Sequence, residues 1–90
     1  MNENEKDNLF QFPCLFPIKV MGKNSDKLYP AVSAIMAKHV TGLDDVTFES
    51  RLSSGDKYLS ITVTIMARSR AQLDAIYLDL NGHELVLMTL

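Results

Sequence analysis

Apolar residues alternate with polar ones in three stretches of this chain, form a nearly continuous run in a fourth, and recur every three or four residues in two others. Alternation with a period of two is typical of half-buried strands, whereas the longer spacing is typical of a helix that buries one face. From residue 16 to residue 90 these stretches predict strand, helix, strand, strand, helix and strand.

The predicted strands occupy residues 16–21, 46–52, 57–66 and 84–90. The third alternates most cleanly, because every second residue from Leu59 to Ile65 is aliphatic. The fourth is apolar on both faces, which predicts a strand covered on both sides. Pro13 and Pro17 lack a backbone donor, so we expect residues 9–16 to form an extended arm over the edge of the core. Gly22 is predicted to end the first strand.

The first helix is predicted over residues 26–39, with Pro30 in its first turn, where a missing N–H is tolerated. The second helix begins at Ser69, because Gln72 three residues later completes a capping box. Asn81-Gly82 ends this helix, since both residues tolerate positive φ. The segment 53–56, Ser-Ser-Gly-Asp, predicts a hairpin loop between the second and third strands.

The order βαββαβ and the right-handed crossover rule predict one fold. It is an α+β, ferredoxin-like two-layer sandwich with an antiparallel sheet of order 4-1-3-2 and two helices on one face. Residues 9–90 are predicted to form a single domain, and residues 1–8 a disordered polar tail that cannot bury apolar surface.

Charge and composition exclude several classes of function. The net charge is −2 and the nine Lys and Arg residues are scattered, so no basic face for nucleic acid is predicted. No apolar run approaches the ~20 residues that cross a bilayer, and the polar start does not match a signal peptide. We therefore expect a cytoplasmic protein that binds neither nucleic acid nor membrane. The one cysteine, Cys14, excludes an internal disulfide.

Three segments resemble a known family: FPCLFPIKVMG at 12–22, YLSITVTIMARSRAQLDAIYLDL at 58–80 and ELVLMTL at 84–90. They are similar to the corresponding segments of the YbeD family of small uncharacterised bacterial proteins. Gln11 stands where that family would have an acidic residue. The resemblance implies a ferredoxin-like fold similar to ACT regulatory domains and no established activity, so no catalytic residue is carried over.

No residue spacing typical of a metal centre or of a nucleophile–base pair occurs. Cys14 is predicted to be a small buried residue, and His39 and His83 to be structural or surface residues. Asp44 and Asp45 are adjacent and would point to opposite faces, which does not suit paired acid–base chemistry. We expect no catalytic residues, no metal site and no cofactor.

One candidate ligand site is the segment Gly22, Lys23, Asn24 and Ser25. It joins a central strand to a helix N-terminus, where backbone N–H groups favour anions. The ACT resemblance implies that this loop contributes to effector binding at a subunit interface. An ordinary turn with a helix cap accounts for the same residues.

A second candidate is the open face of the sheet, for which Lys19, Met21, Tyr58 and Met66 are the predicted partner surface. Methionines adapt to varied partners. Tyr58 is the one aromatic residue predicted on this face, and it lies at a strand end, so base stacking on RNA is not predicted.

These observations predict a non-catalytic regulatory or adaptor domain that binds a small-molecule effector or a protein partner. One alternative is a small acylphosphatase-like enzyme on the same fold; that family uses an arginine after the first strand together with an asparagine. Asn24 is close to such a loop, but no arginine precedes Arg51. The other alternative is a self-associating module, a homodimer joined through sheets or edge strands across a two-fold axis.

Overall fold

The computed structural model describes residues 11–42 and 46–90, which form a four-stranded antiparallel sheet and two α-helices. The expected tail at residues 1–8 and the Asp44-Asp45 pair lie outside these residues. The elements, in chain order, are β1 (Cys14–Lys23), α2 (Leu28–His39), β2 (Thr47–Leu52), the 3-10 turn η2 (Ser54–Asp56), β3 (Tyr58–Ala67), α3 (Arg70–Asn81) and β4 (Met88–Thr89).

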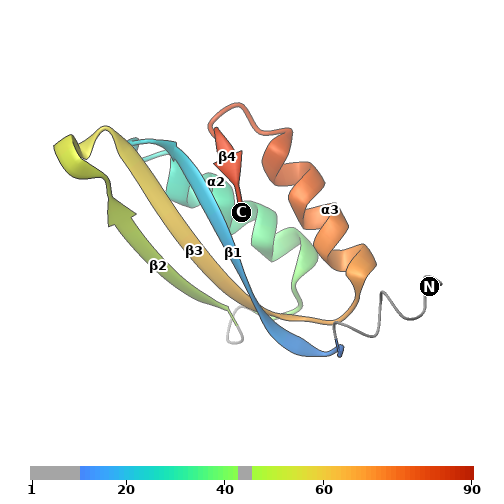
Figure 1. Cartoon of the computed structure of the whole chain (residues 1–90). Coiled ribbons are helices and arrows are strands. Elements are labelled where there is room, and N and C mark those ends of the chain that lie inside the picture. The colour runs from blue at the N-terminus through green and yellow to red at the C-terminus, as the bar shows by residue number, and fades with distance from the viewer. Residues whose placement is uncertain (1–10, 43–45) are drawn as a thin grey trace, which may run out of the picture.

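The strand order across the sheet is β2-β3-β1-β4, with both helices on the same side (Figure 1). This confirms the predicted order 4-1-3-2, which is the same order read from the other edge. The centre of the sheet is the long β1–β3 ribbon, which is paired from Cys14↔Ala67 to Lys23↔Tyr58.

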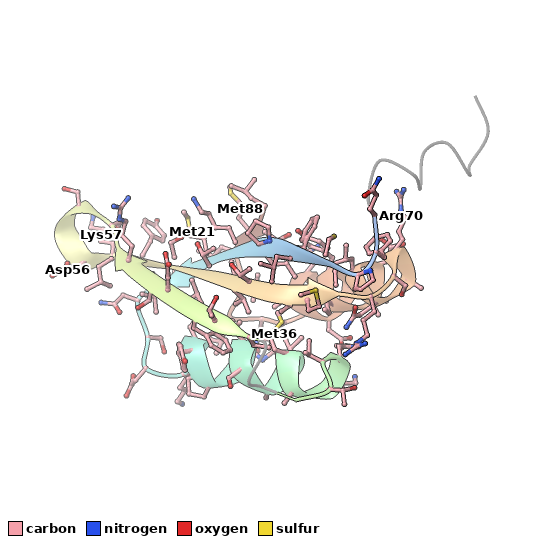
Figure 2. The ribbon with its side chains drawn as sticks, turned by 90° about the horizontal axis from the view of Figure 1, so that it is seen from below. Met21, Met36, Asp56, Lys57, Arg70 and Met88 are labelled. Atoms are coloured by element: carbon pink, nitrogen blue, oxygen red, sulfur yellow. The ribbon has the colours of Figure 1, made fainter. Side chains whose placement is uncertain are left out.

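The core lies between the sheet and the helices. The β1–β3 register directs alternate side chains toward the helices, and Ile18, Ile61 and Val63 are fully buried there. Met36 of α2 lies between the sheet and the helix in Figure 2. Burying one such side chain contributes about 1.5–3 kcal/mol. The buried residues among those described are apolar throughout.

The helix boundaries follow local capping chemistry. The hydroxyl of Ser69 accepts a hydrogen bond from Gln72 N at 3.1 Å, which confirms the predicted cap of α3. The Gln72 side chain accepts from Arg68 N at 2.7 Å, one residue before the position expected in a capping box. Helix α2 begins at Leu28, two residues later than predicted, and Pro30 does lie in its first turn.

The first strand is longer at both ends than predicted. Residues Cys14–Phe16 were expected to belong to an arm, but they pair with β3. Cys14, which was expected to be buried, is half-buried. Gly22 was expected to end the strand, but β1 continues to Lys23. Pro17 is tolerated because its backbone nitrogen faces β4 and not β3. The neighbouring odd-numbered residue Lys19 shows this direction, since Lys19 N donates to Leu90 O at 3.1 Å and Leu90 N donates to Lys19 O at 2.8 Å. The β4 pairing covers Val20 and Met21, so the missing N–H of Pro17 costs no described ladder bond.

The last strand is shorter and more exposed than predicted. A turn takes up residues 83–86, with Val86 N donating to His83 O at 3.1 Å and Leu85 N to His83 Nδ1 at 3.1 Å. Only Met88–Thr89 forms β4, and the expectation that both faces are covered is wrong. The exposed fractions are 56% for Leu87, 50% for Met88 and 68% for Leu90. Met88 and Leu90 lie on the outer face of the sheet, which neither α2 nor α3 covers (Figure 1).

Candidate functional site

The structure makes the segment from Gly22 to Ser25 part of a packed junction. Gly22 is buried, and a Cβ added to it would overlap the carbonyl oxygen of Leu85 and lie 2.9 Å from a methyl carbon of Leu28. The glycine therefore permits close packing between β1 and the segment that leads to β4.

Hydrogen bonds inside the protein use the polar groups that were candidates for ligand binding. Asn24 N donates to Lys57 O at 2.9 Å, and the Asn24 side-chain amide donates to Asp56 O at 3.0 Å. The Ser25 hydroxyl accepts from Lys27 N at 3.1 Å, and Ser25 O accepts from Leu28 N at 3.2 Å. These bonds explain Asn24 and Ser25 without a ligand, and ligand binding at this segment stays a prediction.

The same junction borders a shallow hollow of about 410 Å³. Its lining residues come from two loops that are distant in sequence: Lys23, Asn24, Asp56, Lys57 and Tyr58. Asp56 has a positive φ of 58°, next to Gly55 at 82°, so the η2 turn folds back toward β1. Sequence reasoning did not connect this hairpin loop with the predicted ligand segment, because the contact between them is not local.

The open face of the sheet carries the four residues predicted as a partner surface. In Figure 2, Met21 lies on the side away from α2, together with Met88, its register partner on β4. Tyr58 pairs with Lys23 at one end of the ribbon, and Met66 pairs with Leu15 at the other. Met21 and Leu15 are six residues apart on β1, about 20 Å along the strand. The predicted surface is therefore divided between two ends of the sheet.

Met88 was predicted, with Met21, Met66 and Val86, as part of a candidate apolar patch on this face, whereas two other apolar residues were missed as surface residues. Leu15 had been assigned to the arm, and Leu90 to a strand covered on both sides. The alternation of β1 places Leu15 on the same face as Met21, and the Lys19–Leu90 hydrogen bonds bring Leu90 next to Lys19. A longer first strand would have revealed Leu15 from the sequence, but the exposure of β4 required the helix positions.

The middle of the open face is polar and carries two cations. A hollow of about 370 Å³ is lined by Lys19, Glu49, Ser50, Arg51, Ser60 and Thr62. A smaller one of about 220 Å³ adjoins Met21, Leu52, Ser53 and Tyr58 and shares Lys19, Arg51 and Ser60 with the first. These are open hollows with hydroxyl and cationic groups, which suits contact with carboxylates and other acceptors.

A titratable cluster lies on the helical side, between α2 and α3. His39 Nε2 and Asp79 Oδ2 are 2.6 Å apart, and Lys38 Nζ lies 3.2 Å from the same oxygen. The hydrogen bond from His39, and then the one from Lys38, holds the pKa of the Asp79 carboxyl below its ordinary value. Gln72 also donates to His39 O at 3.0 Å, so the histidine helps to join the two helices.

The structure shows no grouping of metal ligands among residues 11–42 and 46–90. In that same part of the chain, no helix has the length and apolar character needed to span a membrane. Burial raises the pKa of Tyr77, whose hydroxyl donates to Leu90 O at 3.2 Å and ties α3 to the end of the sheet.

Residues 7–90 match the model of a protein family described as a protein of unknown function, DUF493. The UPF0250 protein of Chromobacterium violaceum is 42% identical over 87 residues, which is 97% of this chain and 98% of that protein. A relative from Nitrosomonas europaea, UPF0250 protein NE1487, is 42% identical over 85 residues, covering 94% of this chain and 98% of the relative. A UPF0250 protein of Shewanella woodyi is 39% identical over 84 residues, covering 93% of each.

Two solution structures of protein HP0495 from Helicobacter pylori share the fold. One has a TM-score of 0.77 at 18% sequence identity and covers 100% of this chain and 94% of that chain. The other has a TM-score of 0.59 at 18% identity and covers 88% and 87%. At this identity the likeness establishes the ferredoxin-like architecture and nothing about activity.

Proposed function

Because this chain belongs to the DUF493 family of unknown function, to which YbeD and the UPF0250 proteins also belong, we propose its function from its own surface. It is a non-catalytic adaptor or regulatory domain that binds a protein partner on the open face of its sheet.

The observation that carries this proposal is an apolar group on an uncovered sheet. Met21 and Met88 lie opposite each other in register, and Leu90 lies beside them next to Lys19. Leu15, at the other end of the face, is 66% exposed. A contiguous exposed apolar group on an otherwise polar face is typical of a partner surface.

The charges on this face indicate what the partner carries. Lys19, Lys23 and Arg51 belong to the strands that form it, against one strand carboxylate, Glu49. The strands of this face therefore carry more cations than carboxylates, although the chain as a whole has a net charge of −2. We therefore infer a partner segment that combines apolar side chains with Asp or Glu.

Site-specific photo-crosslinking in the native cytoplasm tests the proposal. A photoreactive residue in place of Met88 should crosslink one defined partner, and the Lys19→Glu change should weaken that crosslink. The matched control is Leu78 on α3, which is 74% exposed but lies away from the open face. Equal crosslinking from Leu78, or none from Met88, would contradict the proposal.

The enzyme alternative has a separate test. Acyl phosphate hydrolysis would need an anion-binding group where β1 meets the following loop, and the candidates there are Lys23, the last residue of β1, and Asn24. Asn24 holds the η2 turn through Asp56 O, which favours a structural role. Purified protein is expected not to hydrolyse acyl phosphates. Hydrolysis that disappears in the Lys23→Ala and Asn24→Ala variants would instead establish the enzyme.

A further inference from the structure

Strand β2 is an edge of the sheet, and its free side presents backbone groups. Ser53 N donates to Tyr58 O at 2.9 Å, so Ser53 directs its backbone groups toward β3. Because this direction alternates along a strand, the residues that direct N–H and C=O away from the sheet are Phe48, Ser50 and Leu52.

This edge has only part of the usual protection against strand pairing, namely the charged residues Glu49 and Arg51. Edge strands commonly carry proline or charged side chains, lysine above all, or a bulge, or are very short. The β2 sequence Thr47–Leu52, TFESRL, has neither proline nor lysine, and its register with β3 runs over six consecutive pairs. The other edge, β4, has two residues. Of the edges in the described part of the chain, β2 is the one suited to accept another strand.

The sequence of β2 is complementary to itself about Ser50. The residues on either side are Glu49 and Arg51, of opposite charge, and beyond them Phe48 and Leu52, both apolar. Neither Glu49 nor Arg51 forms a salt bridge among the described residues, and both side chains are exposed. An antiparallel copy centred on the same serine would pair each charge with its opposite.

We propose that two copies of this chain pair through β2, antiparallel across a two-fold axis at Ser50. Each Glu49 then lies opposite the partner's Arg51, and each Phe48 opposite the partner's Leu52. The outward groups of Phe48, Ser50 and Leu52 form about six backbone hydrogen bonds, two for each directly opposed pair. The two sheets become one sheet of eight strands, four from each copy.

Charge selects this register over its neighbours. Moving the two-fold axis by one residue, which is a register slip of two residues, would place Glu49 opposite the partner's Glu49 or Arg51 opposite the partner's Arg51. Parallel in-register pairing would also bring like charges together. Like charges directly opposite each other destabilise a strand pair, whereas the Glu–Arg pairs stabilise it.

Apolar side chains beside the edge give the pairing a second component. Tyr29 of α2 lies against Phe48, with ring centroids 5.2 Å apart. Tyr29 is 43% exposed and Leu52 46% exposed on the helical side of the edge. Pairing brings Leu52 of one copy next to Phe48 of the other, which covers apolar area that the single chain leaves in water.

Exchanging the charges at positions 49 and 51 of the whole chain tests the proposed register. The oligomeric state is measured by sedimentation equilibrium from about 10 μM to about 1 mM, the range in which dimers with modest interfaces dissociate. The unmodified chain should dimerise in this range. Glu49→Arg alone and Arg51→Glu alone should each weaken the dimer about tenfold or more, because each creates two like-charge contacts. The double variant Glu49→Arg/Arg51→Glu should restore it.

A mixture of the two single variants gives the sharpest result. Each should be mainly monomeric alone, yet the pair should form a heterodimer, because every position in the proposed register then meets its opposite charge. Lys19→Glu, on a central strand of the same face, is the matched control and should leave dimerisation unchanged. Thermal unfolding of each variant, measured where it is monomeric, shows that the fold is intact.

Three outcomes would overturn the proposal. They are a monomeric unmodified chain at about 1 mM, single variants as dimeric as the unmodified chain, or loss of the dimer through Lys19→Glu instead. The last would indicate that copies stack through the open face. Because this test measures self-association alone, its failure leaves the crosslinking test from Met88 unaffected.

Discussion

Gly22→Ala is expected to destabilise the protein, although alanine is normally the better residue in a strand. The new methyl group would overlap Leu85 O and come within 2.9 Å of a methyl carbon of Leu28. The Leu28 side chain can rotate away. The Leu85 carbonyl belongs to the backbone and can move only with the segment that leads into β4, where Leu87 N donates to Met21 O at 2.8 Å.

Two opposing effects set the size of this change. Alanine reduces the freedom of the unfolded chain, which stabilises the fold by about 0.4–1 kcal/mol. Overpacking a well-packed site costs about 1–3 kcal/mol, and a collision with backbone falls in the upper half of that range. We expect a net loss of about 1–2.6 kcal/mol in the free energy of unfolding. For a domain of this size the midpoint of thermal unfolding should fall by roughly 4–21 °C.

Urea unfolding followed by circular dichroism measures this loss. The matched control is Gly82→Ala, whose added Cβ would come no closer than 3.2 Å to the Leu78 carbonyl oxygen and should cost less. A Gly22→Ala variant as stable as the unmodified protein would refute the reasoning, because β1 and the Leu85 segment could not then be in close contact. Unchanged stability with altered ligand binding would favour the ligand site at Gly22–Ser25.

Three further predictions concern the core, a helix cap and the helix–helix contact. Ile61→Ala should lower the free energy of unfolding by about 2–5 kcal/mol in urea titrations, because it empties a fully buried site; a loss below about 1 kcal/mol would mean that Ile61 is not in the core. Ser69→Ala should cost about 1 kcal/mol by removing the α3 cap, whereas Ser69→Asp, which keeps an acceptor, should cost less. Asp79→Asn should flatten the acid limb of the stability–pH curve. The pKa of Asp79 is lower in the folded protein than in the unfolded chain. The ionised Asp79 carboxylate therefore stabilises the fold fully above the unfolded pKa of about 3.9, and this stabilisation is lost as the pH falls through the folded pKa. An unchanged acid limb would mean that the His39–Asp79 contact is absent in solution.

The sequence determined the order of the strands and helices and the buried faces of β3 and of the two helices, but not the short and exposed β4. The alternation from Leu59 to Ile65 and the Ser69–Gln72 cap depend on neighbours within four residues, so they can be read without knowing the fold. The crossover rule then limited these elements to one sheet order, which the structure has.

Tertiary structure decided what depends on contacts between distant residues. Local pattern does not reveal that Pro17 faces a free part of the β1 edge, that Gly22 packs against Leu85, or that His39 meets Asp79 forty positions later. The predicted sheet order already placed β2 at an edge, but only the structure shows its register with β3 and therefore which of its residues direct backbone groups outward. The physical reason is that periodicity fixes the direction in which a side chain points. The residues that it contacts from distant parts of the sequence are fixed only when the elements pack together in the folded protein.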